Sequence, residues 1–247
     1  MNRSGALRLA GTMEEEIARA MRRIRSGRHP RPHYISCLIR DEEVCRIQAR
    51  YGTLHEHRRS HRRYCFADVR VGSHRQDQVQ EGGLHDNSKE DESYNYVDLP
   101  VGTQQDGIRH ALWRLVEARY REAAEGLLRK KSHELTYLDQ HRHLVAFEKR
   151  AAVVDTRWRK LQEVDEDLWR RYVERASRVP LSCPLIKNSS VELQVRNITR
   201  IFVGSEGSLQ VQRAPYWSLE CYLWLLSGRG DALPWTISHF VTDPREL

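Results

Sequence analysis

The sequence has no long hydrophobic run and a low mean hydropathy of −0.71. None of its apolar stretches approaches the roughly eighteen residues that a membrane-spanning helix requires. The basic N-terminus is not followed by an apolar segment of signal-peptide length. The 247 residues are 39% apolar, which is ample for a core. We therefore expect a cytoplasmic globular protein without a membrane segment.

Cysteine is scarce and irregularly spaced. The five residues are Cys37, Cys45, Cys65, Cys183 and Cys221, which is an odd number without any CxxC pair. They lie within apolar patterns, so buried thiols are favoured over a disulfide framework or a zinc site.

Lysine is also rare, although the net charge is +7. Nearly all of the 41 basic residues are arginine, and they are interleaved with 34 acidic residues along every segment. Two arginine-rich segments, Arg19–Arg31 and Arg58–Arg63, could contact phosphate. A solvated face is the commoner explanation of such runs, so nucleic-acid binding through these segments is the alternative function rather than the leading one.

Common catalytic motifs are absent from the sequence. It contains no P-loop, no G-x-G-x-x-G, no EF-hand pattern and no G-x-S-x-G elbow. The segment Gly204–Gly207 lies between two strand patterns and is expected to turn a hairpin.

Histidines form two clusters, His55 with His57 and His61, and His133 with His141 and His143. A zincin helix needs a second histidine four residues after the first. Arg59 and Tyr137 occupy those positions. No catalytic, cofactor-binding or metal-binding residue is therefore predicted, and a zinc hydrolase that uses His55, His57 and His61 is kept only as a third hypothesis.

The best-specified element is a helix within Leu99–Lys131. Its apolar residues recur every three or four positions from Ile108 to Leu128, and Thr103 with Asp106 resembles a capping box. Because this stripe must be covered, we expect the following side chains to be buried: Leu112, Leu115, Val116, Ala123 and Leu127.

The rest of the chain reads as two similar units. Each unit starts with a helix, from Thr12 to Gly27 and from Asp165 to before Pro180. Strand patterns follow, at Tyr34–Arg40, Cys45–Tyr51 and Cys65–Val71 in the first unit, and at Val191–Arg196, Thr199–Val203, Leu209–Val211 and Leu219–Leu225 in the second. The acidic Asp41–Glu43 is expected to connect the first two strands as a hairpin.

These patterns predict an α+β fold in which two helix-plus-antiparallel-meander units surround one long central helix. Residues 1–12 are expected to be a flexible terminus and residues 13–247 a single domain. Residues 73–100 are expected to form a long surface loop, irregular and exposed from Asp77 to Tyr96.

Several segments resemble, in order and spacing, the N-terminal domain of the TldD/PmbA metallopeptidase family, once called modulators of DNA gyrase. The residues that carry the resemblance are Pro32–Ser36, Ala67–Ser73, Asp86, Asn87, Leu99, Pro100, Ile108–Trp113, Tyr120, Ala123, Arg129–Lys131 and Ile201–Ser208. The resemblance extends from about Met13 to the C-terminus.

The resemblance implies a dimeric, two-domain peptidase that acts on unfolded peptides in a cleft between its domains. It also implies that the metal is held by an HExxxH helix and a cysteine of a C-terminal domain, which would begin near Leu247. Zinc is therefore expected only in that missing domain or in a partner. The chain itself is expected to be inactive alone, whether it is a shortened paralogue, a split gene or a remnant.

The resemblance thus favours a non-catalytic domain that binds an unfolded peptide or a metal-bearing partner subunit in proteolysis. It also allows a homo- or hetero-oligomer. The interleaved charges argue against nucleic acid as a partner, and the lack of a long apolar run argues against a membrane. Aromatic enrichment near the end of the chain marks a candidate partner or substrate surface. Its expected members are Tyr216, Trp217, Tyr222, Trp224 and Trp235.

Overall fold

The structure is a computed structural model that describes residues 1–247 except 26, 28, 80–95, 103 and 137–144. In chain order the elements are α1 (Arg3–Arg23), β1 (Pro32–Arg50), β2 (Thr53–Val71), β3 (Tyr96–Asp98), α2 (Gln105–Thr136), β4 (Val154–Trp158), α3 (Glu166–Ala176), the 3₁₀ turn η3 (Val179–Ser182), β5 (Ile186–Gly204), β6 (Leu209–Leu226), β7 (Ala232–Val241) and the 3₁₀ turn η4 (Pro244–Glu246). No helix among these described residues could span a membrane.

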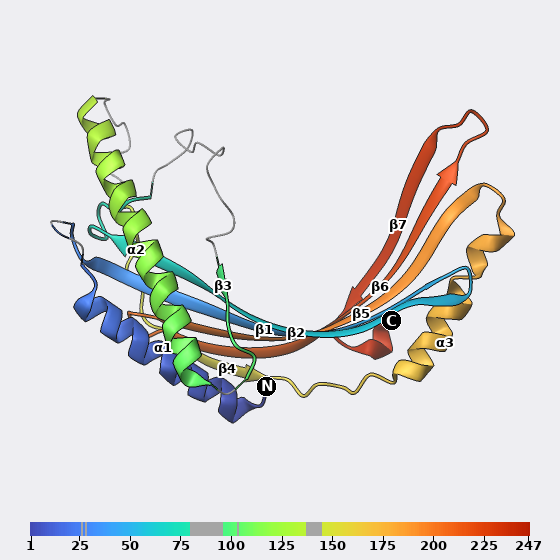
Figure 1. Cartoon of the computed structure of the whole chain (residues 1–247), viewed down its shortest axis with the longest axis horizontal. Helices are drawn as coiled ribbons and strands as arrows, with labels where there is room; N and C mark the ends of the chain where they lie inside the picture. Colours follow the sequence, from blue (N-terminus) through green and yellow to red (C-terminus); the bar gives the residue numbers. More distant parts are fainter. Residues whose placement is uncertain (26, 28, 80–95, 103, 137–144) are drawn as a thin grey trace. The chain divides into compact units, whose positions relative to one another are not determined.

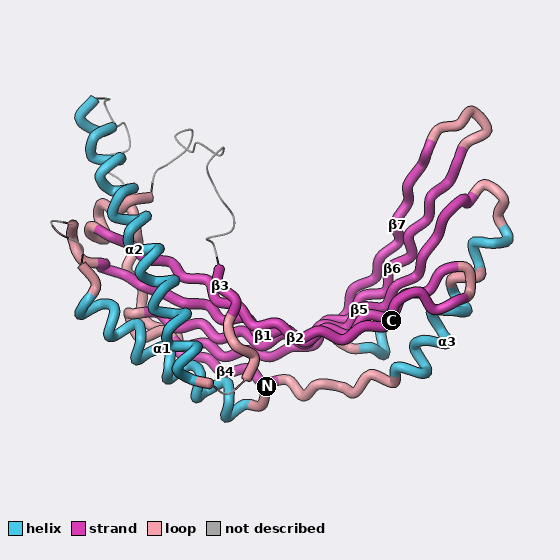
Figure 2. Tube along the Cα trace, viewed as in Figure 1, coloured by secondary structure: helices cyan, strands magenta, loops and turns pink. Residues whose placement is uncertain are grey.

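Seven strands hydrogen-bond in the order β3-β2-β1-β5-β6-β4, and β7 pairs with β6 (Figures 1 and 2). The α+β class is therefore confirmed. Contacts divide the described chain into two compact units. Unit 1 comprises residues 1–41, 63–157 and 200–212, and unit 2 comprises residues 42–62, 158–199 and 213–247.

In unit 1, α1 begins well before the expected start at Thr12. The Asn2 side chain caps the helix by accepting from the Gly5 backbone N–H at 2.8 Å. Ala6, Leu9 and Ala10 are buried on the same face as the later apolar residues. Residues 1–12 are thus largely part of a packed helix rather than the expected flexible terminus, because their apolar positions continue the helical period.

The central helix is present as α2 in unit 1, and its predicted stripe is confirmed. Leu112, Leu115, Val116, Ala123 and Leu127 are all buried. The helix packs against α1 and β3, and Arg109 pairs with Glu15 and Glu16 of α1. Leu128, at the margin of the stripe, is exposed, and the helix continues past Lys131 to Thr136.

The expected turn at Asp41–Glu43 is wrong, because β1 runs through it without interruption. Asp41 is buried and accepts a hydrogen bond from Nε of Arg63 at 2.7 Å. The actual turn is Tyr51–Gly52, with φ of 52° and 84°. Positive φ at both positions is typical of a two-residue hairpin, and Gly52 adopts it without steric penalty.

In the second set of strands, two predicted strands again form one continuous strand. The patterns at Val191–Arg196 and Thr199–Val203 are one strand, β5. The turn predicted at Gly204–Gly207 is confirmed: the Gly204 N–H donates to the Ser208 carbonyl at 2.9 Å, and Gly207 has a φ of +93°.

The loop expected over residues 73–100 is only partly described, since residues 80–95 lie outside the described residues. Asp77 is buried and pairs with Arg70 at 2.9 Å, so the expectation that it is exposed is wrong. Tyr96 opens the short strand β3, and Leu99 is buried.

Unit 2 has its own core, built on one face of its strands and on α3. Its fully buried side chains include Ile47, Val173 and Leu193, and Trp169 of α3 lies 6.0 Å from the Trp217 ring. Asp165 caps α3 by accepting from the Leu168 N–H. The predicted arrangement of two units around one central helix is not confirmed. In unit 2 the helix that completes the core is α3, not the central helix α2.

Candidate functional site

The β6–β7 ribbon of unit 2 carries an exposed apolar surface, which we call the β7 surface: Leu233, Trp235 and Ile237, with Leu223 and Leu225 opposite them on β6. Their cross-strand pairs are Leu225 with Leu233 and Leu223 with Trp235. Trp235 is 63% exposed, and Leu233 and Ile237 are exposed as well. The opposite face of the ribbon also exposes apolar side chains, among them Trp224 and Phe240. Exposed apolar area of this kind typically marks an interaction site.

The predicted aromatic surface is only partly present. Trp217 is 2% exposed and belongs to the unit 2 core, so its assignment to a surface is wrong. Alternation along β6 puts Tyr222 and Trp224, which are both exposed, on the opposite face from Trp217 and Trp235. Tyr216 is half-buried on that opposite face. The five aromatic residues therefore do not form one patch.

The hydrogen-bonding edge of β7 can be assigned from its neighbour. The Leu226 N–H donates to the Leu185 carbonyl at 3.0 Å, whereas the Ser227 N–H donates to the Asp231 carbonyl at 2.9 Å. The backbone N–H of Leu226, which lies opposite Ala232, thus points away from β7. Because the direction alternates in an antiparallel ladder, the backbone groups of Thr236, Ser238 and Phe240 point outward from the sheet.

Pro234 occupies the same outward-pointing series, where its missing N–H interrupts no bond to β6. Within the described part of the chain, β7 pairs only with β6. Its outer edge therefore offers unpaired backbone donors and acceptors next to the β7 surface (Figure 2).

The first histidine cluster lies on β2 of unit 2. His55 and His57 are two residues apart on the strand, and His57 and His61 are four apart. A strand advances by about 7 Å for every two residues. This spacing does not bring the three imidazoles to one point. Of the second cluster, His141 and His143 lie outside the described residues, and the side chain of His133 is not described.

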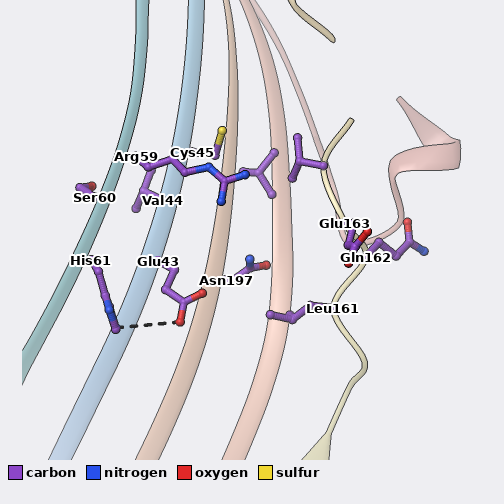
Figure 3. Close-up of a pocket in the computed structure, with 12 residues that line it drawn as sticks. Glu43, Val44, Cys45, Arg59, Ser60, His61, Leu161, Gln162, Glu163 and Asn197 are labelled. Atoms are coloured by element: carbon purple, nitrogen blue, oxygen red, sulfur yellow. Dashed lines mark ion pairs between the residues drawn. The ribbon is translucent and has the colours of Figure 1, made fainter. Parts of the chain in front are cut away.

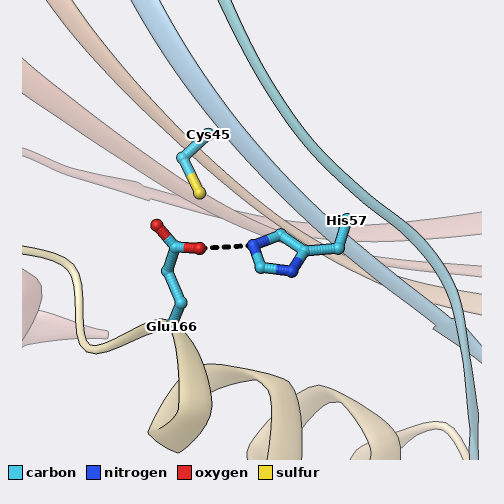
Figure 4. Close-up of side chains that lie close together, drawn as sticks. All are labelled: Cys45, His57 and Glu166. Carbon is cyan, nitrogen blue, oxygen red and sulfur yellow. Dashed lines mark hydrogen bonds and ion pairs between the residues drawn. The ribbon is translucent and has the colours of Figure 1, made fainter.

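A group that sequence spacing did not reveal lies on three elements of unit 2: Cys45 of β1, His57 of β2 and Glu166 at the start of α3 (Figure 4). One potential ligand atom from each residue lies within 4.8 Å of the other two. Nε2 of His57 is 2.5 Å from Oε2 of Glu166. Burial raises the pKa of the Cys45 thiol, and the nearby Arg59 guanidinium opposes that shift.

A pocket of about 660 Å³ adjoins this group (Figure 3). Cys45 lines it together with Glu43, Arg59, His61 and Asn197. The lining combines these charged, amide and thiol side chains with the apolar Val44, Leu161, Val164 and Val195, so the pocket offers both polar and apolar contacts.

Three arginines of the two arginine-rich segments are paired with carboxylates in the structure. Arg59 pairs with Glu166, Arg63 is buried with Asp41, and Arg19 pairs with Glu16. Paired guanidinium groups are poorly available to phosphate, which weighs against the nucleic-acid alternative.

No protein-family profile matches the chain, and no curated protein matches its sequence. Among solved structures, a candidate modulator of DNA gyrase from Bacteroides thetaiotaomicron aligns with a TM-score of 0.56 at 8% identity. The alignment covers 97% of this chain and 45% of that one. The chain has the fold of part of that protein.

Two further solved structures align less closely. A candidate DNA gyrase modulator from Thermotoga maritima aligns over 87% of this chain with a TM-score of 0.43 at 8% identity. TldE from Thermococcus kodakarensis aligns over 85% with a TM-score of 0.39 at 7% identity. This chain spans less than half the length of each of these three proteins.

Proposed function

We propose that this chain is a non-catalytic, TldD/PmbA-type domain that binds extended peptides and associates with a second subunit in proteolysis. The observation that carries the proposal is the outer edge of β7, where outward-pointing backbone groups lie beside exposed apolar side chains. The fold shared with a candidate gyrase modulator is consistent with the family to which the sequence is similar.

An extended peptide fits this edge by adding a strand to the sheet. Its main chain would bond to the outward groups of Thr236, Ser238 and Phe240, which are independent of the peptide's sequence. Alternate peptide side chains would contact Trp235 and Ile237, and this contact adds affinity for apolar residues. The mode suits unfolded substrates of varied sequence.

The test compares Ser238→Pro with Ser238→Ala in the full chain. Both variants remove the hydroxyl, but only proline removes the outward N–H and thereby shortens the row of backbone groups that can pair with a peptide. The probe is a fluorescein-labelled, unstructured ten-residue peptide that alternates valine with threonine, and its binding is followed by fluorescence anisotropy. We expect Ser238→Pro to weaken binding by about tenfold, because one backbone hydrogen bond and strand alignment are lost.

Ser238→Ala is expected to bind like the wild type. Equal affinities for the two variants, or no binding by the wild type, would exclude strand addition at β7. Light scattering tests the association with a second subunit, since a clean monomer contradicts self-association. A peptide-cleavage assay with added zinc tests the non-catalytic assignment, which cleavage by this chain alone would overturn.

A further inference from the structure

Cys45, His57 and Glu166 converge from three separate elements of unit 2 (Figure 4). Thiolate, imidazole and carboxylate are the three ligand types that zinc accepts most often in proteins. Zinc bond lengths imply separations between tetrahedral ligands of roughly 3.3 to 3.8 Å. The three atoms, all within 4.8 Å of one another, can reach that spacing by side-chain rotation.

The His57–Glu166 contact is compatible with an exchange of protons for metal. Nε2 of His57 and Oε2 of Glu166 are 2.5 Å apart, which is a hydrogen-bonding distance. Zn²⁺ would bind Nε2 of the neutral imidazole, whose ring proton is then on Nδ1, and the Cys45 thiolate, whose proton is released to water. It would move Nε2 and Oε2 apart by about 1 Å. Charge balance supports the exchange, since one thiolate and one carboxylate together match the divalent ion.

Arg59 occupies a position that leaves the inner carboxylate oxygen available. It contacts Oε1 of Glu166, whereas Oε2 faces His57. Hydrogen bonding to the second oxygen is how outer groups commonly orient a ligating carboxylate. The Arg59 side chain is 70% exposed, so it can also withdraw to relieve repulsion of the ion.

We propose that Cys45, His57 and Glu166 bind one zinc ion, with water from the adjoining pocket as the fourth ligand. Cys45 lines that pocket, which gives the ion a route to the site. Three protein ligands and one water complete the four-coordinate, tetrahedral shell that zinc prefers. The site is independent of the β7 edge and does not depend on the proposed peptide binding.

The test uses the full chain, loaded with zinc or cobalt(II) and then desalted. Elemental analysis measures retained zinc, and the near-ultraviolet cobalt spectrum reports a thiolate ligand. Cys45→Ser, His57→Gln and Glu166→Gln remove one ligand each. The matched controls are Cys221→Ser, a cysteine elsewhere in unit 2, and His55→Gln, two residues from His57 on β2.

We expect the wild type and both controls to retain one zinc per chain and to show the thiolate–cobalt band. Cys45→Ser should abolish the band. Each ligand variant should weaken zinc binding by at least about tenfold, because even changes around a ligand have effects of that size. His57 is partly exposed, so His57→Gln remains informative if Cys45→Ser fails to fold.

Two results would overturn the proposal. One is wild-type zinc retention well below one equivalent, which would leave an adventitious ion only. The other is a thiolate–cobalt band that persists in folded Cys45→Ser, because the thiolate would then come from another cysteine.

Discussion

Asp41→Asn should strongly destabilise unit 1, because it breaks a buried ion pair. The side chains of Arg63 and Asp41 are only 6% and 2% exposed, and Nε lies 2.7 Å from Oδ2. Nη1 of Arg63 also donates to the carbonyls of Pro100 at 2.7 Å and Gly102 at 3.3 Å. The pair thus connects two strands to the segment that leads into α2.

The expected loss follows from desolvation. Removing one partner leaves a buried charge without its counterion, which lowers the free energy of unfolding by about 3–5 kcal/mol. For a chain of this size that loss corresponds to a fall in Tm of roughly 6–20 °C. Replacing both partners, Asp41→Leu with Arg63→Met, should cost less than Asp41→Asn because no charge remains to be buried, and its remaining cost is the loss of the hydrogen bonds from Arg63 to the Pro100 and Gly102 carbonyls.

Thermal unfolding followed by circular dichroism provides the assay for Asp41→Asn. It is also applied to the double-mutant cycle made of the wild type, Asp41→Leu, Arg63→Met and the double variant. Arg150→Gln is the matched control, since its pair with Glu148 lies in the same unit but is exposed. We expect that control to change stability by less than about 1 kcal/mol. If Asp41→Asn were no worse than Arg150→Gln, water would reach the pair and the burial argument would fail.

Two further predictions concern unit 1. Leu115→Ala should lower the free energy of unfolding by about 2–5 kcal/mol in urea titrations. Leu128→Ala, on the exposed side of the same helix, should change it little. A loss below about half a kcal/mol for Leu115→Ala, roughly that of a surface change, would contradict burial of the stripe. Burial, reinforced by the neighbouring His74, lowers the pKa of His33 from its ordinary value of 6.5. The unfolded chain therefore binds the proton more readily than the folded chain, and the free energy of unfolding should fall as the pH drops below about 6.5. In His33→Phe, part of that fall should disappear from urea midpoints measured across this range, and identical pH profiles would refute the assignment.

The central helix was predictable because helical periodicity is a local signal. The stripe from Ile108 to Leu127 repeats over many turns, and nothing distant is needed to interpret it. The strand boundaries were not predictable in the same way. Asp41 looks like a turn residue until Arg63, distant in sequence, is brought beside it, and only tertiary structure shows that partner.

The same limit applies to the candidate metal site. His57 and Glu166 are separated by 109 residues, and Cys45 lies on a third element. Motif searches detect ligands that share one helix or one turn, so they find no signal in such a group. For β7, a signal was present: Leu233, Trp235 and Ile237 alternate with Pro234 and polar residues. No strand was predicted there from the sequence. Pro234 weakens the signal, because proline is excluded from central strands and tolerated only at a sheet edge.

Trp217 and Trp235 share one face of the β6–β7 ribbon, so sequence alternation cannot tell which of them is buried. The difference in burial between these two tryptophans arises because α3 is shorter than β7. The 11 residues of α3 span about 16 Å, whereas the ten residues of β7 span about 33 Å. The residues that pack against the unit 2 core include Leu219, Cys221 and Val241, near Trp217. A helix this short cannot also cover Trp235, so the apolar end of the ribbon stays exposed.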